Sequence, residues 1–134
     1  MNGTDRITTG KRGESCACRE LRRRGYAIVA TRYRTRIGEL DIIARDRGTL
    51  VFVEVKARRG DRYGPPAEAV TWQKRAKLCA MAADYLHRHR LEGVPCRFDV
   101  VAVRLDIGKP PHIDVLVNAF DAARYGGYGI GDKG

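Results

Sequence analysis

The run Leu50–Lys56, LVFVEVK, constrains the fold more than any other part of the chain, because it is almost continuously apolar through Val55. A strand with one face in water alternates apolar and polar side chains, whereas a strand buried on both faces reads as an unbroken apolar run. Residues 49–56 are therefore predicted to form a central strand of a sheet. Glu54 interrupts this strand, and an unpaired carboxylate in such a position is strongly destabilising.

Capping and turn signals indicate the elements before and after this strand. A helix is expected from Thr8 or Thr9, either of which could cap it, to Arg24, with Gly25 as the residue that ends it. A tight turn at 46–48 predicts a hairpin between the central strand and the one before it. The predicted strands besides the central one are Tyr26–Tyr33, Glu39–Ala44, Phe98–Leu105 and Ile113–Val117.

A long helix is predicted over about Ala67–His89, after a charged loop and the pair Pro65-Pro66. Its apolar residues recur at helical spacing, which indicates one face packed on the sheet. Trp72 belongs to this stripe and is therefore expected in the core rather than on the surface as a platform for stacking bases. The stripe consists of Ala69, Trp72, Ala76, Cys79, Ala83 and Leu86.

The length of 134 residues suits one domain, predicted over 1–124, followed by a glycine-rich tail, 125–134, that is expected to be disordered. The sequence shows neither a secretory signal nor an apolar run long enough to cross a bilayer, so a cytoplasmic location is expected.

Charge gives the first indication of a partner. The chain carries 26 basic and 16 acidic side chains, a net charge of +10. Residues 1–60 contain 15 basic and 7 acidic residues, which leaves +8 in the first part of the chain. Such an asymmetry favours a polyanion as partner. The arginines do not follow one strongly amphipathic helix with bulky apolar residues opposite, so nucleic acid is favoured and no membrane partner is expected.

Three acidic residues stand where apolar ones are expected. Besides Glu54 in the central strand, Asp41 lies among Leu40, Ile42 and Ile43 in the neighbouring strand, and Glu14 shares a helical face with Ala17, Cys18 and Leu21. Lys56 leaves the central strand on the same face as Glu54. A buried Glu54–Lys56 ion pair alone is one interpretation. Three carboxylates near one lysine would leave excess negative charge, which favours a divalent ion such as Mg²⁺ or Mn²⁺.

The spacing Asp-x₁₂-Glu-x-Lys across a hairpin then predicts phosphodiester chemistry. An ion held by Asp41 and Glu54, with the backbone carbonyl of Val55, could polarise a phosphodiester and lower the pKa of a bound water. Lys56 would orient that water or stabilise charge in the transition state. Glu14 could bind the ion through water or complete a second site.

Five segments in order, TGKRGESCA, YRTRIGELDIIARD, LVFVEVKARR, YGPPAEAVTWQK and RFDVV, resemble the bacterial YraN-like family of uncharacterised proteins. That family is similar in pattern to archaeal Holliday junction resolvases and other PD-(D/E)xK nucleases. The resemblance implies an α/β, restriction-endonuclease-like fold, a mixed sheet flanked by helices in the order α-β-β-β-α-β. It places the nuclease motif on Glu14, Asp41, Glu54 and Lys56.

The resemblance also implies a role for Lys74, which matches a lysine typical of the family and could reach a phosphate, although a solvated helix lysine is an equally good interpretation. Arg32 departs from the family pattern, which has asparagine at that position, and Leu40 replaces the proline of the nuclease motif. Asp99 of RFDVV is interpreted as structural, paired with Arg97 or another basic residue. Further candidates for phosphate contacts are Arg34, Arg36, Arg58 and Arg59.

Three functions remain open from the sequence. The first is a metal-dependent nuclease acting on DNA in preference to RNA, on branched or single-stranded substrates, for which symmetric cutting would favour a homodimer. The second is a non-catalytic nucleic-acid-binding module that retains the fold and the cluster. The third is a protein-interaction factor whose acidic cluster is only a structural ion network.

Overall fold

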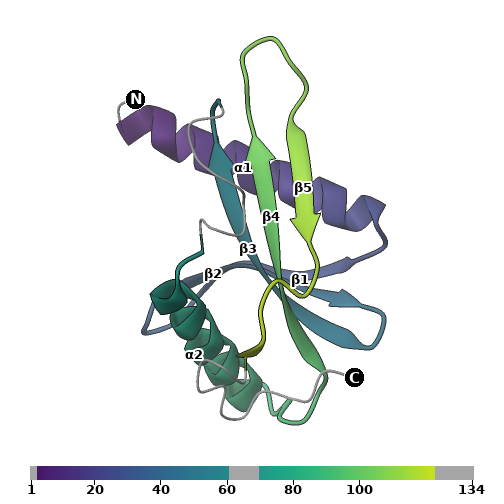
Figure 1. Ribbon diagram of the computed structural model, residues 1–134. Coiled ribbons are helices and arrows are strands. Elements are labelled where there is room, and N and C mark those ends of the chain that lie inside the picture. Colours follow the sequence, from purple (N-terminus) through teal and green to yellow (C-terminus); the bar gives the residue numbers. More distant parts are fainter. Residues whose placement is uncertain (1–2, 61–69, 123–134) are drawn as a thin grey trace.

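The computed structural model describes residues 3–60 and 70–122, and the predicted disordered tail 125–134 lies outside these residues. Two helices and five strands follow one another along the chain (Figure 1). They are α1 (Gly3–Arg23), β1 (Ala27–Arg34), β2 (Glu39–Asp46), β3 (Thr49–Arg58), α2 (Trp72–Arg88), β4 (Cys96–Arg104) and β5 (His112–Leu116).

The strands form one mixed sheet in the order β1-β2-β3-β4-β5. The pair β3–β4 is parallel and runs in register from Leu50 opposite Cys96 to Arg58 opposite Arg104, whereas the other three pairs are antiparallel. A parallel pair requires a crossover, and α2 lies within it. The α/β fold class is thus confirmed, with one strand more than the order implied by the resemblance, and the arrangement is consistent with a restriction-endonuclease-like fold.

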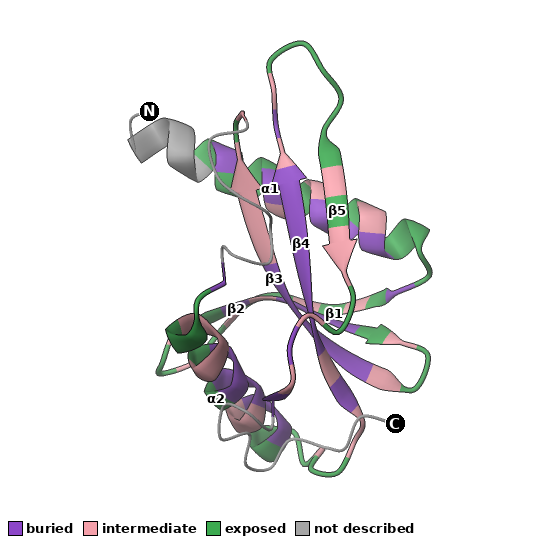
Figure 2. Cartoon of the chain, in the orientation of Figure 1, coloured by how far each residue is buried: buried purple, intermediate pink, exposed green. Residues whose placement is uncertain are grey.

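Strand β3 is buried on both faces, as its apolar run predicts. Leu50 and Phe52 pack in a core with residues of α2, and Val51 and Val53 pack in a second core with residues of α1. The two helices therefore cover opposite faces of the sheet, and Figure 2 shows the buried residues of β3 and β4 between them. Neither described helix combines the length and the apolar character that crossing a membrane requires.

Both helices begin at residues other than those predicted. Helix α1 starts at Gly3, so Thr9 lies within the helix and does not cap it. The Thr9 hydroxyl instead accepts a hydrogen bond of 3.3 Å from Arg59 Nε. Helix α2 starts at Trp72, and Thr71 is its N-cap, with Oγ1 accepting from Lys74 N at 3.2 Å. Of the residues predicted to precede this start, 67–69 lie outside the described part of the chain.

The prediction that Trp72 is a core residue is wrong, because its exposed fraction is 62 %. Farther along the same stripe Cys79 and Leu86 are buried, so the periodicity does mark the face that packs on the sheet. Packing of α2 into the core starts only at Leu78. Since Trp72 is the first residue of the helix, it lies beyond that core.

Strand β1 is irregular near Arg32, the residue that departs from the pattern of the family that the chain resembles. Its register against β2 shifts between Ile28 and Ala30, and Arg32 has a φ of +50°. This left-handed conformation is tolerated far better by asparagine than by most other non-glycine residues. The asparagine that the resemblance implies at this position would thus suit the backbone better than Arg32.

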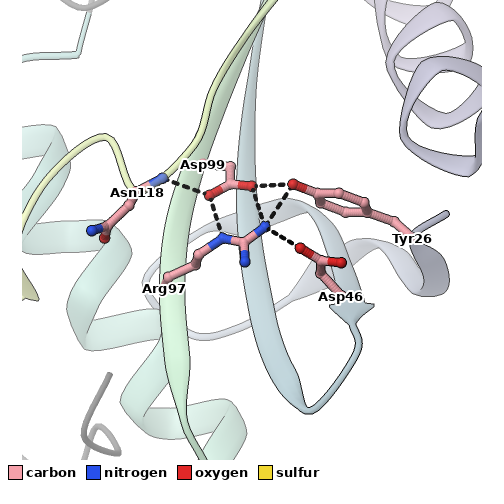
Figure 3. A network of polar contacts seen from close by, with 5 residues as sticks. All are labelled: Tyr26, Asp46, Arg97, Asp99 and Asn118. Atoms are coloured by element: carbon pink, nitrogen blue, oxygen red, sulfur yellow. Dashed lines mark hydrogen bonds and ion pairs between the residues drawn. The ribbon is translucent and has the colours of Figure 1, made fainter. Parts of the chain in front are cut away.

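A buried polar network fastens the hairpin end of the sheet (Figure 3). Arg97 donates to Asp99 and, at 2.9 Å, to Asp46 Oδ2, and Tyr26 donates to Asp99 Oδ2 at 2.8 Å. The backbone N–H of Asn118 donates to the same carboxylate at 2.9 Å. Burial, followed by the hydrogen bond to Asp99, raises the pKa of Tyr26 to about 12. Asp99 is thus placed as predicted, in a structural pair with Arg97.

Gly13 marks the closest approach of α1 to the sheet and allows a test of this packing. A Cβ added at Gly13 would overlap the Cβ of Ala57 in β3, whereas one added at Gly10 meets nothing within 4 Å. We expect Gly13→Ala to lower the free energy of unfolding by ~1–3 kcal/mol in urea titrations, because overpacking outweighs the better helix propensity of alanine. The matched variant Gly10→Ala should instead stabilise by ~0.5–1 kcal/mol. Equal stabilisation by both variants would contradict this packing.

Candidate metal centre

Asp41 lies where β2 and β3 separate. Backbone pairing between these strands ends at Ile42 opposite Val53. Beyond that pair the Asp41 carboxylate takes the place of a backbone acceptor, since Val55 N donates to Asp41 Oδ2 at 2.9 Å. The side chain is therefore held at the fork between the two strands rather than turned to solvent.

Glu54 is buried beside this fork, with an exposed fraction of 4 %. Side chains alternate along a strand, so Glu54 and Lys56 project from β3 on the face of Leu50 and Phe52, which α2 covers. The Lys74 Nζ of α2 lies 2.7 Å from Glu54 Oε2, and the Lys56 Nζ lies 3.8 Å from the same oxygen. The structure thus brings Asp41, Glu54, Lys56 and Lys74 together, and we call these four residues the carboxylate–lysine cluster.

The surroundings of Asp41 shift its ionisation strongly. Burial raises the pKa of Asp41 to about 8, and a hydrogen bond to Glu54 and the charge of Glu54 add to this effect. The Val55 N–H and the charge of Lys74 oppose it but do not cancel it. The raised pKa therefore favours the protonated form of Asp41 beside Glu54 in the folded chain.

The two lysines respond in opposite ways to the same surroundings. Burial, and then the charge of Lys74, lower the pKa of Lys56. Burial alone would also lower the pKa of Lys74, but its contact with Glu54 outweighs that penalty and raises the pKa. Lys74 is therefore the firmer counter-ion of Glu54, although the sequence pointed to Lys56 for that role.

The donor set fits a hard divalent cation. Glu54 Oε2 is wholly buried, and no hydrogen-bond donor among the described residues is well directed at it, despite the short distance to Lys74 Nζ. Asp41 and Glu54 could supply two carboxylates at one point, and Mg²⁺ commonly binds through one or two carboxylates with waters completing its shell. Within residues 8–60 and 70–122, no group of three or more metal-ligating acidic, histidine or cysteine side chains occurs, so two carboxylates are the protein ligands that the geometry offers.

Glu14 is placed apart from this cluster. It belongs to α1, which covers the other face of the sheet, and its Oε1 accepts from Arg32 Nε at 2.8 Å. It lines a groove of about 600 Å³. The other residues lining the groove are Ser15, Cys18, Arg19, Arg22, Thr31 and Arg32.

The predicted phosphate-contacting arginines flank the cluster in sequence, on either side of its strands. Arg34 pairs with Glu39 at 2.9 Å, and Arg36 is exposed in the turn before β2. Arg58 is half-buried at the end of β3, and Arg59 is exposed but bonded to Thr9. The contact of Lys74 with Glu54 was missed by the sequence interpretation, since spacing along the chain does not show where a helix after a long connection meets β3.

Comparison with known proteins places the chain in a family. Residues 13–103 match the family model described as "Uncharacterised protein family UPF0102". The chain belongs to the UPF0102 family. This is the YraN-like family that the sequence motifs resemble.

Relatives within the UPF0102 family match over most of both chains. A UPF0102 protein of Syntrophus aciditrophicus is 46 % identical over 122 residues, which are 90 % of this chain and 94 % of the relative. A UPF0102 protein of Symbiobacterium thermophilum is 49 % identical over 113 residues, 84 % of this chain and 96 % of the relative. One from Nocardia farcinica is 47 % identical over 116 residues, 87 % and 91 % of the two chains.

The raised pKa of Asp41 makes the stability of the folded chain depend on pH. Its pKa rises from 3.8 to about 8 on folding, so between these values the folded chain holds a proton that the unfolded chain has lost. The free energy of unfolding from this group therefore falls as pH rises through that window. Asn at this position cannot ionise but can still accept from Val55 N and donate to Glu54.

We accordingly expect Asp41→Asn to be more stable than the wild type at pH 7–8 in EDTA, on the order of 2 kcal/mol, with the difference closing towards pH 4. Urea unfolding measured across pH 4–8 tests this, with Glu39→Gln on β2, an exposed carboxylate paired with Arg34, as the control. A constant difference across the whole range, or none, would show that Asp41 is ionised in the folded chain.

Proposed function

We propose that this UPF0102 protein is a metal-dependent nuclease that hydrolyses phosphodiester bonds in DNA. The observation that carries the proposal is the cluster itself, in which Asp41 and Glu54 meet beside a strand fork with Lys56 on the same face of β3. A purely structural ion pair needs one carboxylate and one cation. Here a second carboxylate, Asp41, is partly buried beside the first, and this raises its pKa.

The chemistry divides among the four residues. Asp41 and Glu54 would hold Mg²⁺ or Mn²⁺, which when bound polarises a phosphodiester and lowers the pKa of a coordinated water. Lys56 is half-buried beside the carboxylates and can donate to a phosphate oxygen as negative charge grows on it. The positive charge of Lys74 offsets the negative charge of Glu54, and this lowers the repulsion between the cluster and an approaching phosphate.

The positive charge of the chain supports a nucleic acid as substrate. Of the net +10, a surplus of +8 lies in residues 1–60, which contain α1 and β1 to β3. Arg36 precedes Asp41 in the turn before β2, and Arg59 follows Lys56 at the end of β3. Such exposed cations attract phosphates to a site that carries carboxylates of its own. The resemblance to junction resolvases supports DNA, and symmetric cutting of such a substrate would use a homodimer.

A second candidate function is a nucleic-acid-binding module without catalysis. It is favoured by the balance of the cluster, where Lys56 and Lys74 already face Asp41 and Glu54. The two lysines already offset the negative charge of the carboxylates, so the set can stand without a metal ion. The two candidates differ in whether a metal ion changes what the protein does to DNA.

Cleavage assays on labelled duplex, single-stranded, flap and four-way-junction DNA in EDTA, Mg²⁺ or Mn²⁺ distinguish these candidates. We expect cleavage only with metal and a rate at least ~100-fold lower in Glu54→Gln, because that change keeps the volume but removes a ligand charge. Glu39→Gln on β2, an exposed carboxylate paired with Arg34, is the matched control and should cleave like the wild type. Circular dichroism verifies that each variant is folded.

Two other outcomes decide against the nuclease. Salt-sensitive DNA binding without cleavage under any metal condition assigns the protein to the non-catalytic module. If the protein neither cleaves nor binds DNA, both proposals are rejected. The remaining function is then the protein-interaction factor whose acidic cluster is a structural ion network.

A further inference from the structure

The groove that Glu14 lines between α1 and β1 is rich in arginine, and we call it the arginine groove. Its lining residues include three arginines and one acidic residue, Glu14. The Glu14 carboxylate already accepts from Arg32 Nε at 2.8 Å, so its negative charge is offset within the groove. The surplus of positive charge therefore comes from Arg19 and Arg22, which both belong to α1.

Arg19 and Arg22 are exposed and lack the acidic partner that the arginines after them have. Arg23 and Arg24 both pair with Glu20, at 2.6 and 2.9 Å. Within the described parts of the chain, neither Arg19 nor Arg22 forms an ion pair or a side-chain hydrogen bond. Both guanidinium groups therefore keep their hydrogen-bond donors for a ligand from outside the chain.

The remaining walls of the groove add hydroxyl groups and no further negative charge. Ser15 and Thr31 can each donate a hydrogen bond to an anion. Burial raises the pKa of the Cys18 thiol despite the opposing charge of Arg22, so the thiol stays neutral at neutral pH. Lys11 is exposed four residues before Ser15, and it extends the positive charge by one turn along the same face of α1.

The composition and the length of the groove favour a nucleic acid over a protein as its ligand. Protein interfaces bury apolar and aromatic side chains at their centre, and the groove has no large apolar side chain in its lining. Protein–nucleic acid interfaces are polar and positively charged instead. The cations from Lys11 to Arg22 extend along about 17 Å of helix. This length exceeds one phosphate and suits a strand whose charges recur every few ångströms.

We propose that the arginine groove binds the phosphate backbone of a nucleic acid through Arg19 and Arg22. Thr31 of the groove lies opposite Ile42, the neighbour of Asp41, so the groove and the carboxylate–lysine cluster lie at the same level of the sheet, on opposite faces. Contacts with phosphates position a nucleic acid without reading its sequence. This inference rests on the proposed function for the kind of polyanion, but binding in the groove requires neither metal nor cleavage.

The anisotropy of a labelled oligo-dT in EDTA, followed across salt concentrations, measures this contact. We expect the double variant Arg19→Gln/Arg22→Gln to bind about tenfold more weakly or worse at low salt. The slope of log affinity against log salt concentration should become shallower by about 1–2, because up to two phosphate contacts are removed. Arg19→Lys/Arg22→Lys retains both charges and should keep most of the affinity.

The matched control is Arg23→Gln/Arg24→Gln. It removes the same charge from neighbouring residues that pair with Glu20 and do not line the groove. Its affinity loss should be much smaller than that of Arg19→Gln/Arg22→Gln. Circular dichroism verifies that each variant is folded.

Glu14→Gln tests the groove in the opposite direction. The change removes the one acidic side chain among the lining residues and releases Arg32 from its ion pair. Affinity for oligo-dT should therefore rise, by about two- to fivefold. A damaged fold would weaken binding, so a gain in affinity cannot come from unfolding, and a loss would contradict the proposed contact.

The outcomes separate this inference from the nuclease proposal. Weaker binding by Arg19→Gln/Arg22→Gln alone, with no cleavage by the wild type under any metal condition, would retain the groove and reject the nuclease. Metal-dependent cleavage by the wild type, with equal affinity losses in the two glutamine double variants, would overturn the groove alone. Competition by polyglutamate, or by inorganic phosphate, as effective as that by unlabelled oligo-dT would assign the groove to another anion and would likewise overturn it.

Discussion

The burial of β3 on both faces is the constraint on which the rest of the structure depends. Helix α1 covers Val51 and Val53, and helix α2 covers Leu50 and Phe52, so the sheet needs both helices. A strand in this position has no route to water for a charged side chain. The charge of Glu54 is offset there by Lys74, which α2 brings to it after the crossover, and by Lys56 of β3 itself. The fold and the cluster thus require each other.

The separation of β2 and β3 beyond Ile42 and Val53 places a second carboxylate, Asp41, beside the buried Glu54. An uninterrupted strand pair would place a backbone carbonyl opposite Val55, and carbonyl oxygens carry no negative charge. Replacing it with the Asp41 carboxylate satisfies the same N–H and adds a group that can bind a cation. The second carboxylate is costly for the folded chain, because burial and the charge of Glu54 raise the pKa of Asp41 and so disfavour its ionised form. A feature that costs stability and serves no packing role is typical of a functional site.

The sequence predicted what depends on local patterns and missed what depends on long-range placement. The apolar run of β3 identified the central strand, and the alternation within it identified Glu54 and Lys56 as neighbours. The same reasoning predicted Trp72 in the core, because periodicity shows which face of a helix is apolar but not where the core under it ends. The partners of Glu14 and Lys74 depend on how each helix lies on the sheet, so no spacing along the chain predicts them.

The network around Arg97 has a consequence for the order in which the chain folds. The hairpin of β2 and β3 consists of neighbouring residues and can form early, but Asp46 at its end finds its cation only when β4 arrives. Tyr26 likewise can form its hydrogen bond only when β4 brings Asp99, which is 73 residues away along the chain. Until the C-terminal strands join, the N-terminal part of the sheet holds unsatisfied polar groups at sites that folding will bury. Folding is therefore cooperative across the whole sheet, and a chain that stops before β4 lacks the residues that complete its first half.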